Sequence, residues 1–102
     1  MGMGVGVGVG VGLEELLRLT VAALMQATGE SQRVVAGVLG LTQTQVSRRQ
    51  SGVTSWTLRD VDVLAEYYEM AALDVLAGPT RACEMLPAAR RRAVRVGKGV
   101  AR

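Results

Sequence analysis

The sequence predicts a compact all-α domain of five helices, with a Gly-Val segment before it and a basic tail after it. Apolar residues recur at helical spacing, and glycine, serine or threonine stands where each helix would begin or end. Phe is absent, and the only aromatic residues are Trp56, Tyr67 and Tyr68. The core must therefore be built from Leu, Val, Ala and Met, which suits a small helical bundle. A chain of 102 residues has room for one domain of ordinary size.

Residues 1–12 alternate glycine with valine after a Met-Gly start. Glycine at every even position does not fit the G-x-G-x-x-G spacing of a dinucleotide-binding loop. The segment lacks the basic start and long apolar run of a signal peptide, and it is too short to span a membrane. We expect a flexible, disordered extension here and no membrane attachment, and a mis-chosen translation start would also explain the composition.

The first helix is expected over about residues 13–27. Its inward face carries residues at helical spacing, namely Leu13, Leu16, Leu17, Thr20, Leu24 and Ala27. Gly29 is a stop signal at the C-terminal end of this helix.

A second helix is expected over about residues 32–39. Ser31 suits its N-cap, because the serine hydroxyl can accept a hydrogen bond from an otherwise unpaired backbone N–H. Its apolar face is formed by Val35, Ala36 and Leu39, and the small Ala36 lets another helix approach closely. Gly40 then ends the helix and turns the chain, since glycine accepts a positive φ without a Cβ clash.

The third helix is expected over residues 42–50. Thr42 and Gln45 form a Thr-x-x-Gln capping box at its start, and Ser51-Gly52 ends it. Val46 is the only plainly apolar residue inside it, so one buried side chain would hold a helix whose other faces are wet. Two crossed helices with a glycine corner form a helix-turn-helix, and the second helix is of the kind that enters a DNA major groove.

The segment resembles the helix-turn-helix of the Cro/repressor-type (XRE) transcriptional regulators. The similarity lies in the first, fifth, ninth and fifteenth positions of the motif and in residues just after it: Gln32, Ala36, Gly40, Val46, Ser47, Arg48 and Gly52. Residues 57–78 are also similar to that family's fourth and fifth helices. The resemblance implies a compact repressor-like DNA-binding domain.

Two residues depart from that family's pattern, which usually has an apolar residue at the position of Arg49 and an acidic one at that of Gln50. We expect Arg49 to lay its stem along the core and keep its guanidinium in water.

The fourth helix is expected to begin at Thr57, with Asp60 as its capping partner. Its inward residues are expected to be Leu58, Val61, Leu64, Ala65 and Tyr68. A short fifth helix over about 72–77 carries Leu73 and Leu76 and stops at Gly78-Pro79. The helix-turn-helix domain then spans residues 13–79, and residues 80–102 form a basic extension in which 80–86 and 88–96 are partly helical.

Positive charge is concentrated in two segments of the chain. Residues 31–59 contain four arginines and no acid, and the chain from Pro87 onward contains Lys98 and five arginines, again with no acid. An acidic stretch from Asp60 to Asp74 lies between them. This distribution is typical of a protein that places one face on phosphates and keeps another face away from them.

Enzymatic chemistry finds little support in the composition. There is no His, and Cys83 is the only cysteine, so an internal disulfide, the usual zinc sites and the usual nucleophile–base pairs are excluded. The acid pairs Asp60/Asp62 and Glu66/Glu69 have the spacing of a solvated helix face. We expect no enzyme, no metal, no cofactor and no small-molecule substrate, with Cys83 as a small apolar filler in a reducing, cytoplasmic setting.

The predicted site is the exposed face of the third helix. Its side chains with the chemistry to contact base edges are Gln43, Thr44, Gln45, Ser47 and Arg48, because Gln pairs with adenine and Arg with guanine. Expected contacts to the DNA backbone are Gln32, Arg33, Arg49, Trp56 and Arg59; by the resemblance, Gln32 looks like a phosphate-binding residue. Arg33 and Arg59 are equally consistent with ordinary exposed side chains, and Trp56 with a cover on the core edge.

We therefore predict a sequence-specific regulator of transcription that binds double-stranded DNA in the nucleoid, of the phage- or mobile-element repressor type. A homodimer on a palindromic operator is expected, through an apolar surface of Leu73, Leu76, Met85 and Leu86. The arginine-rich tail either adds DNA affinity or is a solvated end. The alternatives are an antitoxin or other protein-binding module on the same scaffold, and a small structural protein built on residues 1–12.

Overall fold

The computed structural model describes residues 12–92, and these residues form six α-helices, one 3-10 turn and no strand. The elements are α2 (Leu13–Thr28), α3 (Gln32–Leu39), α4 (Gln43–Ser51), α5 (Leu58–Tyr67), α6 (Ala72–Leu76), α7 (Pro79–Met85) and the turn η1 (Ala88–Arg90). The all-α prediction is confirmed. Our expectations for the Gly-Val segment and for most of the basic tail fall on residues 1–11 and 93–102, which lie outside the described residues.

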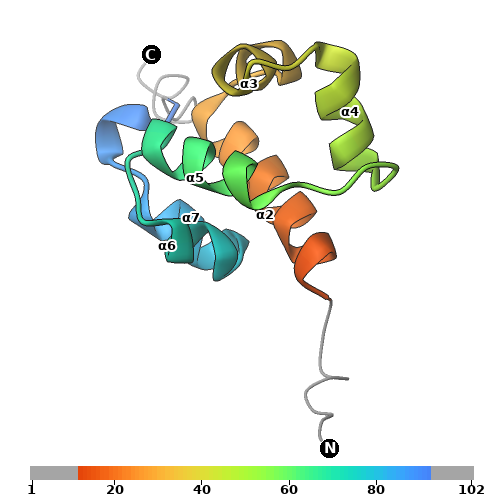
Figure 1. Cartoon of the computed structure of the whole chain (residues 1–102). Helices are drawn as coiled ribbons and strands as arrows, with labels where there is room; N and C mark the ends of the chain where they lie inside the picture. The colour runs from red at the N-terminus through yellow and green to blue at the C-terminus, as the bar shows by residue number, and fades with distance from the viewer. Residues whose placement is uncertain (1–11, 93–102) are drawn as a thin grey trace, which may run out of the picture.

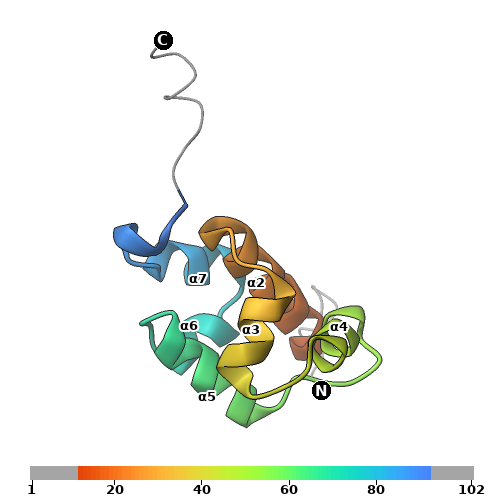
Figure 2. The ribbon, with the colours of Figure 1, turned by 90° about the horizontal axis from the view of Figure 1, so that it is seen from above.

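The long helix α2 and helix α5 form the middle of the molecule (Figure 1). α3 and α4 lie on one side of this pair, and α6 and α7 lie on the other (Figures 1 and 2). α2 packs against α4, α6 and α7, while α3 packs against α4 and α5. One hydrophobic core therefore runs through all six helices.

That core is made mostly of aliphatic residues, as the composition predicts, together with the fully buried Tyr68 and with Trp56. Its fully buried members with 0–1 % exposure include Val21, Leu24, Val35, Val46, Leu64, Tyr68 and Val75. Thr20 is also buried, and its hydroxyl donates a hydrogen bond to the Leu16 carbonyl oxygen at 2.9 Å. The polar group is thus satisfied within its own helix.

The helix ends lie where the capping residues predict them. The Ser31 hydroxyl accepts a hydrogen bond from the Val34 N–H, and α3 ends at Gly40, which has a φ of 71°. A reciprocal capping box of Thr42 and Gln45 begins α4. Local hydrogen bonding of a few short side chains therefore sets the boundaries of the two helices of the motif.

Two leucines that we expected to face inward are exposed instead. Leu13 is 54 % exposed and Leu58 is 75 % exposed. Leu13 and Leu58 are the first residues of α2 and α5. In α6 the buried residue is Val75, and a residue two positions earlier points about 200° away from it on a helix of 3.6 residues per turn. Leu73 is 75 % exposed on the opposite side of α6, which agrees with its place in the expected apolar surface.

The packed helices continue past residue 79, where we placed the end of the domain. α7 packs along α2, with Ala82 0 % and Leu86 3 % exposed as members of the core. The small Ala82 allows this close helix approach. Leu86 is not available for the expected dimer surface, because its side chain is buried within its own chain.

Residues that follow α7 contact the C-terminal ends of α2 and α5. The carboxylate of Glu30 accepts hydrogen bonds from the hydroxyls of Tyr67 at 2.7 Å and Tyr68 at 3.0 Å. The guanidinium of Arg90 lies 4.5 Å from the centre of the Tyr67 ring and 3.4 Å from Glu30. The Arg92 N–H donates to the Ala27 carbonyl oxygen at 2.9 Å. The basic segment is therefore part of the fold at least to residue 92.

Burial raises the pKa of the Tyr68 hydroxyl, and the neighbouring Glu30 carboxylate raises it further. No helix among residues 12–92 is long and apolar enough to cross a membrane.

Candidate nucleic-acid interface

Helix α4 carries most of its side chains on the outside of the fold. Gln43, Thr44, Gln45, Ser47 and Arg48 are all exposed, whereas Val46 is 0 % exposed. Val46, Arg49 and Gln50 are spaced i, i+3 and i+4, so they share the inward side of the helix. The prediction that a single buried apolar residue anchors an otherwise polar helix is confirmed.

Not all of the exposed residues are equally available to a partner. The side-chain oxygen of Gln45 accepts a hydrogen bond from the Thr42 N–H at 2.8 Å, which closes the capping box. The Gln45 amide then keeps only its donor side for another molecule, and bidentate pairing with adenine needs both a donor and an acceptor. The free groups of α4 are therefore on Gln43, Thr44, Ser47 and Arg48.

Arg49 does not lie where we expected it. Its Nε donates a hydrogen bond to Asp60 Oδ2 at 2.7 Å, and the two side chains are only 13 % and 4 % exposed. The guanidinium is therefore largely shielded from water, which corrects the expectation that it lies in solvent, and its pairing with Asp60 argues against the expected backbone contact. The physical reason is the buried carboxylate, because a buried charge requires an oppositely charged or hydrogen-bonding partner.

The burial of Asp60 also differs from our expectation. We placed it with Asp62 on a solvated helix face, yet Asp60 is 3 % exposed. Its Oδ2 accepts hydrogen bonds from the Thr57 N–H at 3.0 Å and from Arg49. The capping box of Thr57 and Asp60 is nevertheless confirmed. The carboxylate thus caps α5 and pairs with α4 at the same time.

Trp56 lies over the edge of the core and is 7 % exposed, so it is withdrawn from the expected DNA contacts. Its ring centre is 5.9 Å from the Cζ atom of Arg49, which is within the range of a cation–π contact. The indole Nε1 is buried and has no hydrogen-bond partner in the described part of the chain. Trp56 covers the Arg49–Asp60 pair and does not present its face to solvent.

Three expected backbone contacts remain at the surface. Arg33 and Arg59 are exposed, and Gln32 is half-buried at the first residue of α3. Within residues 12–92, neither Arg33 nor Arg59 forms an ion pair, and the same is true of Arg48. Their charges are therefore not neutralised by the described chain.

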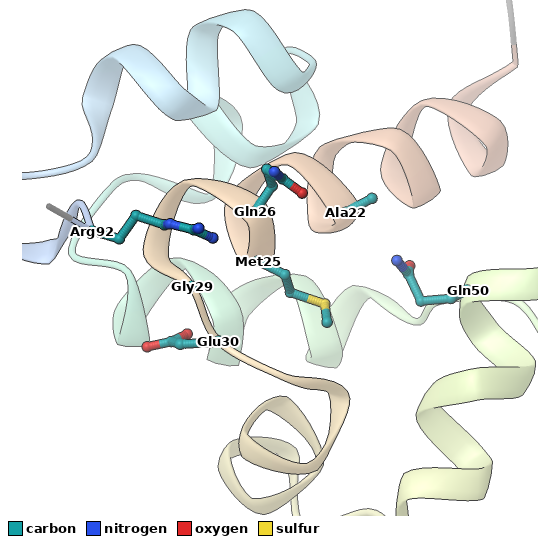
Figure 3. A pocket seen from close by; sticks show the side chains of 7 residues that line it. All are labelled: Ala22, Met25, Gln26, Gly29, Glu30, Gln50 and Arg92. Carbon is teal, nitrogen blue, oxygen red and sulfur yellow. The ribbon is translucent and has the colours of Figure 1, made fainter. Parts of the chain in front are cut away.

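A shallow pocket of about 300 Å³ separates the C-terminal part of α2 from the end of α4. It is lined by Ala22, Met25, Gln26, Gly29, Glu30, Gln50 and Arg92, and Figure 3 shows Gln50 reaching into it from α4. The Gln50 Oε1 atom is shielded and has no partner in the described chain. The sequence pattern did not predict this pocket. One of its lining residues, Gln50, stands at a position where the Cro/repressor-type pattern usually has an acidic residue. No three His, Cys, Asp or Glu side chains among the described residues are grouped as metal ligands.

The chain matches the BetR domain family over residues 13–95. This range begins at α2 and extends past η1, so it includes α7 within the domain, as the structure does. No curated protein and no solved structure matches the chain. BetR domains are small helical domains that often occur in regulators containing a helix-turn-helix. The match covers most of the 102 residues, and the chain therefore belongs to the BetR domain family.

Proposed function

We propose that this protein is a transcriptional regulator that binds double-stranded DNA sequence-specifically and reads the major groove with α4. The observation that carries the proposal is the division of α4 into two sides. Val46 and Arg49 attach the helix to the fold, while Gln43, Thr44, Ser47 and Arg48 remain exposed. Glutamine and arginine on an accessible helix are the side chains that pair most directly with adenine and guanine.

Contacts to the phosphates are assigned to Gln32, Arg33 and Arg59. Arg33 and Arg59 carry charges that the described chain leaves without an acidic partner, and Gln32 lies at the capped start of α3. Helix starts and basic side chains are common phosphate contacts, which orient a protein on the duplex and do not read its sequence. Arg49 and Trp56 have no place in this set, because both are turned into the fold.

In more detail, we propose a Cro/repressor-type regulator of phage or mobile-element kind that acts as a homodimer in the nucleoid. A single helix-turn-helix reads few base pairs, so a palindromic operator with half-sites about 34 Å apart is expected. The dimer surface is assigned to α6 and α7, where Leu73 is 75 % and Met85 is 38 % exposed.

Selection of bound duplexes from a random DNA pool tests the proposal. We expect an enriched palindrome with the wild type and a loss of the enriched bases with Gln43→Ala or Arg48→Ala. Glu66→Gln is the control, because Glu66 is exposed on α5, outside both α4 and the assigned dimer surface. A pool without enrichment would contradict the proposal. If Leu73→Asp abolished capture of a partner protein while Arg48→Ala did not, the antitoxin-like alternative would be favoured.

A further inference from the structure

Helix α4 contributes a single buried side chain to the core. Among its nine residues only Val46 is buried, and one apolar side chain acts as a pivot that does not by itself set the direction of a helix. α4 packs on α2 and α3, and six residues lie between the end of α4 and the start of α5. A polar contact near the C-terminal end of α4 adds a further, directional constraint.

Such a contact is the ion pair between Arg49 and Asp60. Arg49 lies three residues after Val46, so the two side chains leave the same side of α4 almost one turn apart. The bond from Arg49 Nε to Asp60 Oδ2 is 2.7 Å long, and both side chains are largely buried. A short charge-assisted hydrogen bond has a preferred distance and angle, whereas an apolar contact is not directional.

Asp60 is itself fixed in place. Its Oδ2 accepts the Thr57 N–H, and its own N–H donates to the Thr57 hydroxyl, both at 3.0 Å. The carboxylate therefore moves with the first turn of α5, whose next residue, Val61, is in the core. The Cζ atom of Arg49 also lies 5.9 Å from the centre of the Trp56 ring. Arg49 is thus in contact with both Asp60 and Trp56.

We propose that Arg49, Asp60 and Trp56 act together as positioning residues that set the direction of α4 for base readout. This inference rests on the proposed DNA-binding function. Two points then define the helix direction: Val46 in the core and Arg49 on Asp60. A buried ion pair contributes little net stability compared with well-packed apolar residues of similar size, but in some proteins it fixes one geometry among several. The pair would therefore contribute to specificity more than to folding.

The test compares specific with non-specific affinity. In the double variant Arg49→Met/Asp60→Asn, the asparagine oxygen still caps α5, and no charge remains buried without a partner. We expect a folded protein whose affinity for the selected operator falls about tenfold or more, while its affinity for a duplex without the operator changes less than about twofold. Arg33→Met is the matched control and should weaken binding to both duplexes alike.

The salt dependence separates positioning from direct contact. Each phosphate contact contributes about 0.9 to the slope of log affinity against log salt concentration. We expect an unchanged slope for the Arg49 variants and a smaller slope for Arg33→Met. A slope reduced by about 0.9 in the Arg49 variants would overturn the inference, since Arg49 would then contact a phosphate.

Arg49→Lys provides a second variant in case the double variant does not fold. It keeps the charge for Asp60 but loses the planar group beside Trp56. We expect the ratio of operator to non-operator affinity to fall several-fold with an unchanged salt slope. If a folded Arg49 variant kept the wild-type ratio of operator to non-operator affinity, the positioning role would be overturned but the proposed DNA-binding function would stand. A wild-type protein without sequence preference would refute the proposed function as well, so the two failures are distinguishable.

Discussion

Removal of the Arg49 side chain alone should strongly destabilise the fold. Arg49→Ala leaves the carboxylate of Asp60 without its cation at a site where the Asp60 side chain is only 4 % exposed. Breaking a buried pair by removing one partner typically costs about 3–5 kcal/mol, because the remaining charge is uncompensated. The total stability of a small domain is about 5–15 kcal/mol, so the expected loss is a large fraction of it.

The assay is urea unfolding followed by circular dichroism, with a double-mutant cycle over Arg49→Ala and Asp60→Asn. We expect the double variant to be more stable than Arg49→Ala, because the amide introduced by Asp60→Asn carries no charge that requires a partner. Arg59→Ala is the control, since Arg59 is exposed and outside any ion pair of the described residues. A loss below about 1 kcal/mol, the value of an exposed pair, would refute the reasoning.

The remaining predictions concern readout, the turn, the tail and a buried tyrosine. Arg48→Ala should cost about 1–3 kcal/mol of discrimination at one base pair of the selected operator, measured by competition binding; equal tolerance of all bases by wild type and variant would contradict this role. Gly40→Ala should destabilise the fold by about 1–2 kcal/mol in urea unfolding, because φ is 71° while no atom lies within 4 Å of the added Cβ; an unchanged midpoint would show that the turn tolerates a side chain. Truncation after Arg92 removes three basic residues and should lower the salt slope by up to about 0.9 for each lost phosphate contact, whereas an unchanged slope would exclude the tail from DNA binding. The Tyr68 hydroxyl has a raised pKa, so its neutral form is favoured in the folded state; its contribution to stability is complete below pH 10 and is lost as the pH rises through the folded-state pKa. Tyr68→Phe should therefore reduce the loss of stability at alkaline pH, measured by thermal melts at pH 9 to 12. Identical pH profiles of wild type and variant would contradict this role of Tyr68.

The helix-turn-helix could be predicted from sequence because its boundaries depend on near neighbours. Ser31 and Thr42 cap helices that start one residue later, and Gly40 provides the left-handed turn between them. Each of these contacts spans at most four residues, so the pattern of side chains determines them without reference to the rest of the fold. The exposed face of α4 follows from the same local reasoning, since Val46 is its only apolar residue.

The tertiary structure decided which charged and apolar side chains are buried. Arg49 and Asp60 are 11 residues apart, and nothing in helical spacing brings the two together. In the five-residue helix α6 only Val75 is buried, and α7 joins the core because its Ala82 packs on the side of α2. Burial depends on which helices become neighbours in space, and that is a property of the whole chain. The sequence by itself determined where α3 and α4 begin and end and that α4 stays polar, because those features depend on hydrogen bonds within one turn.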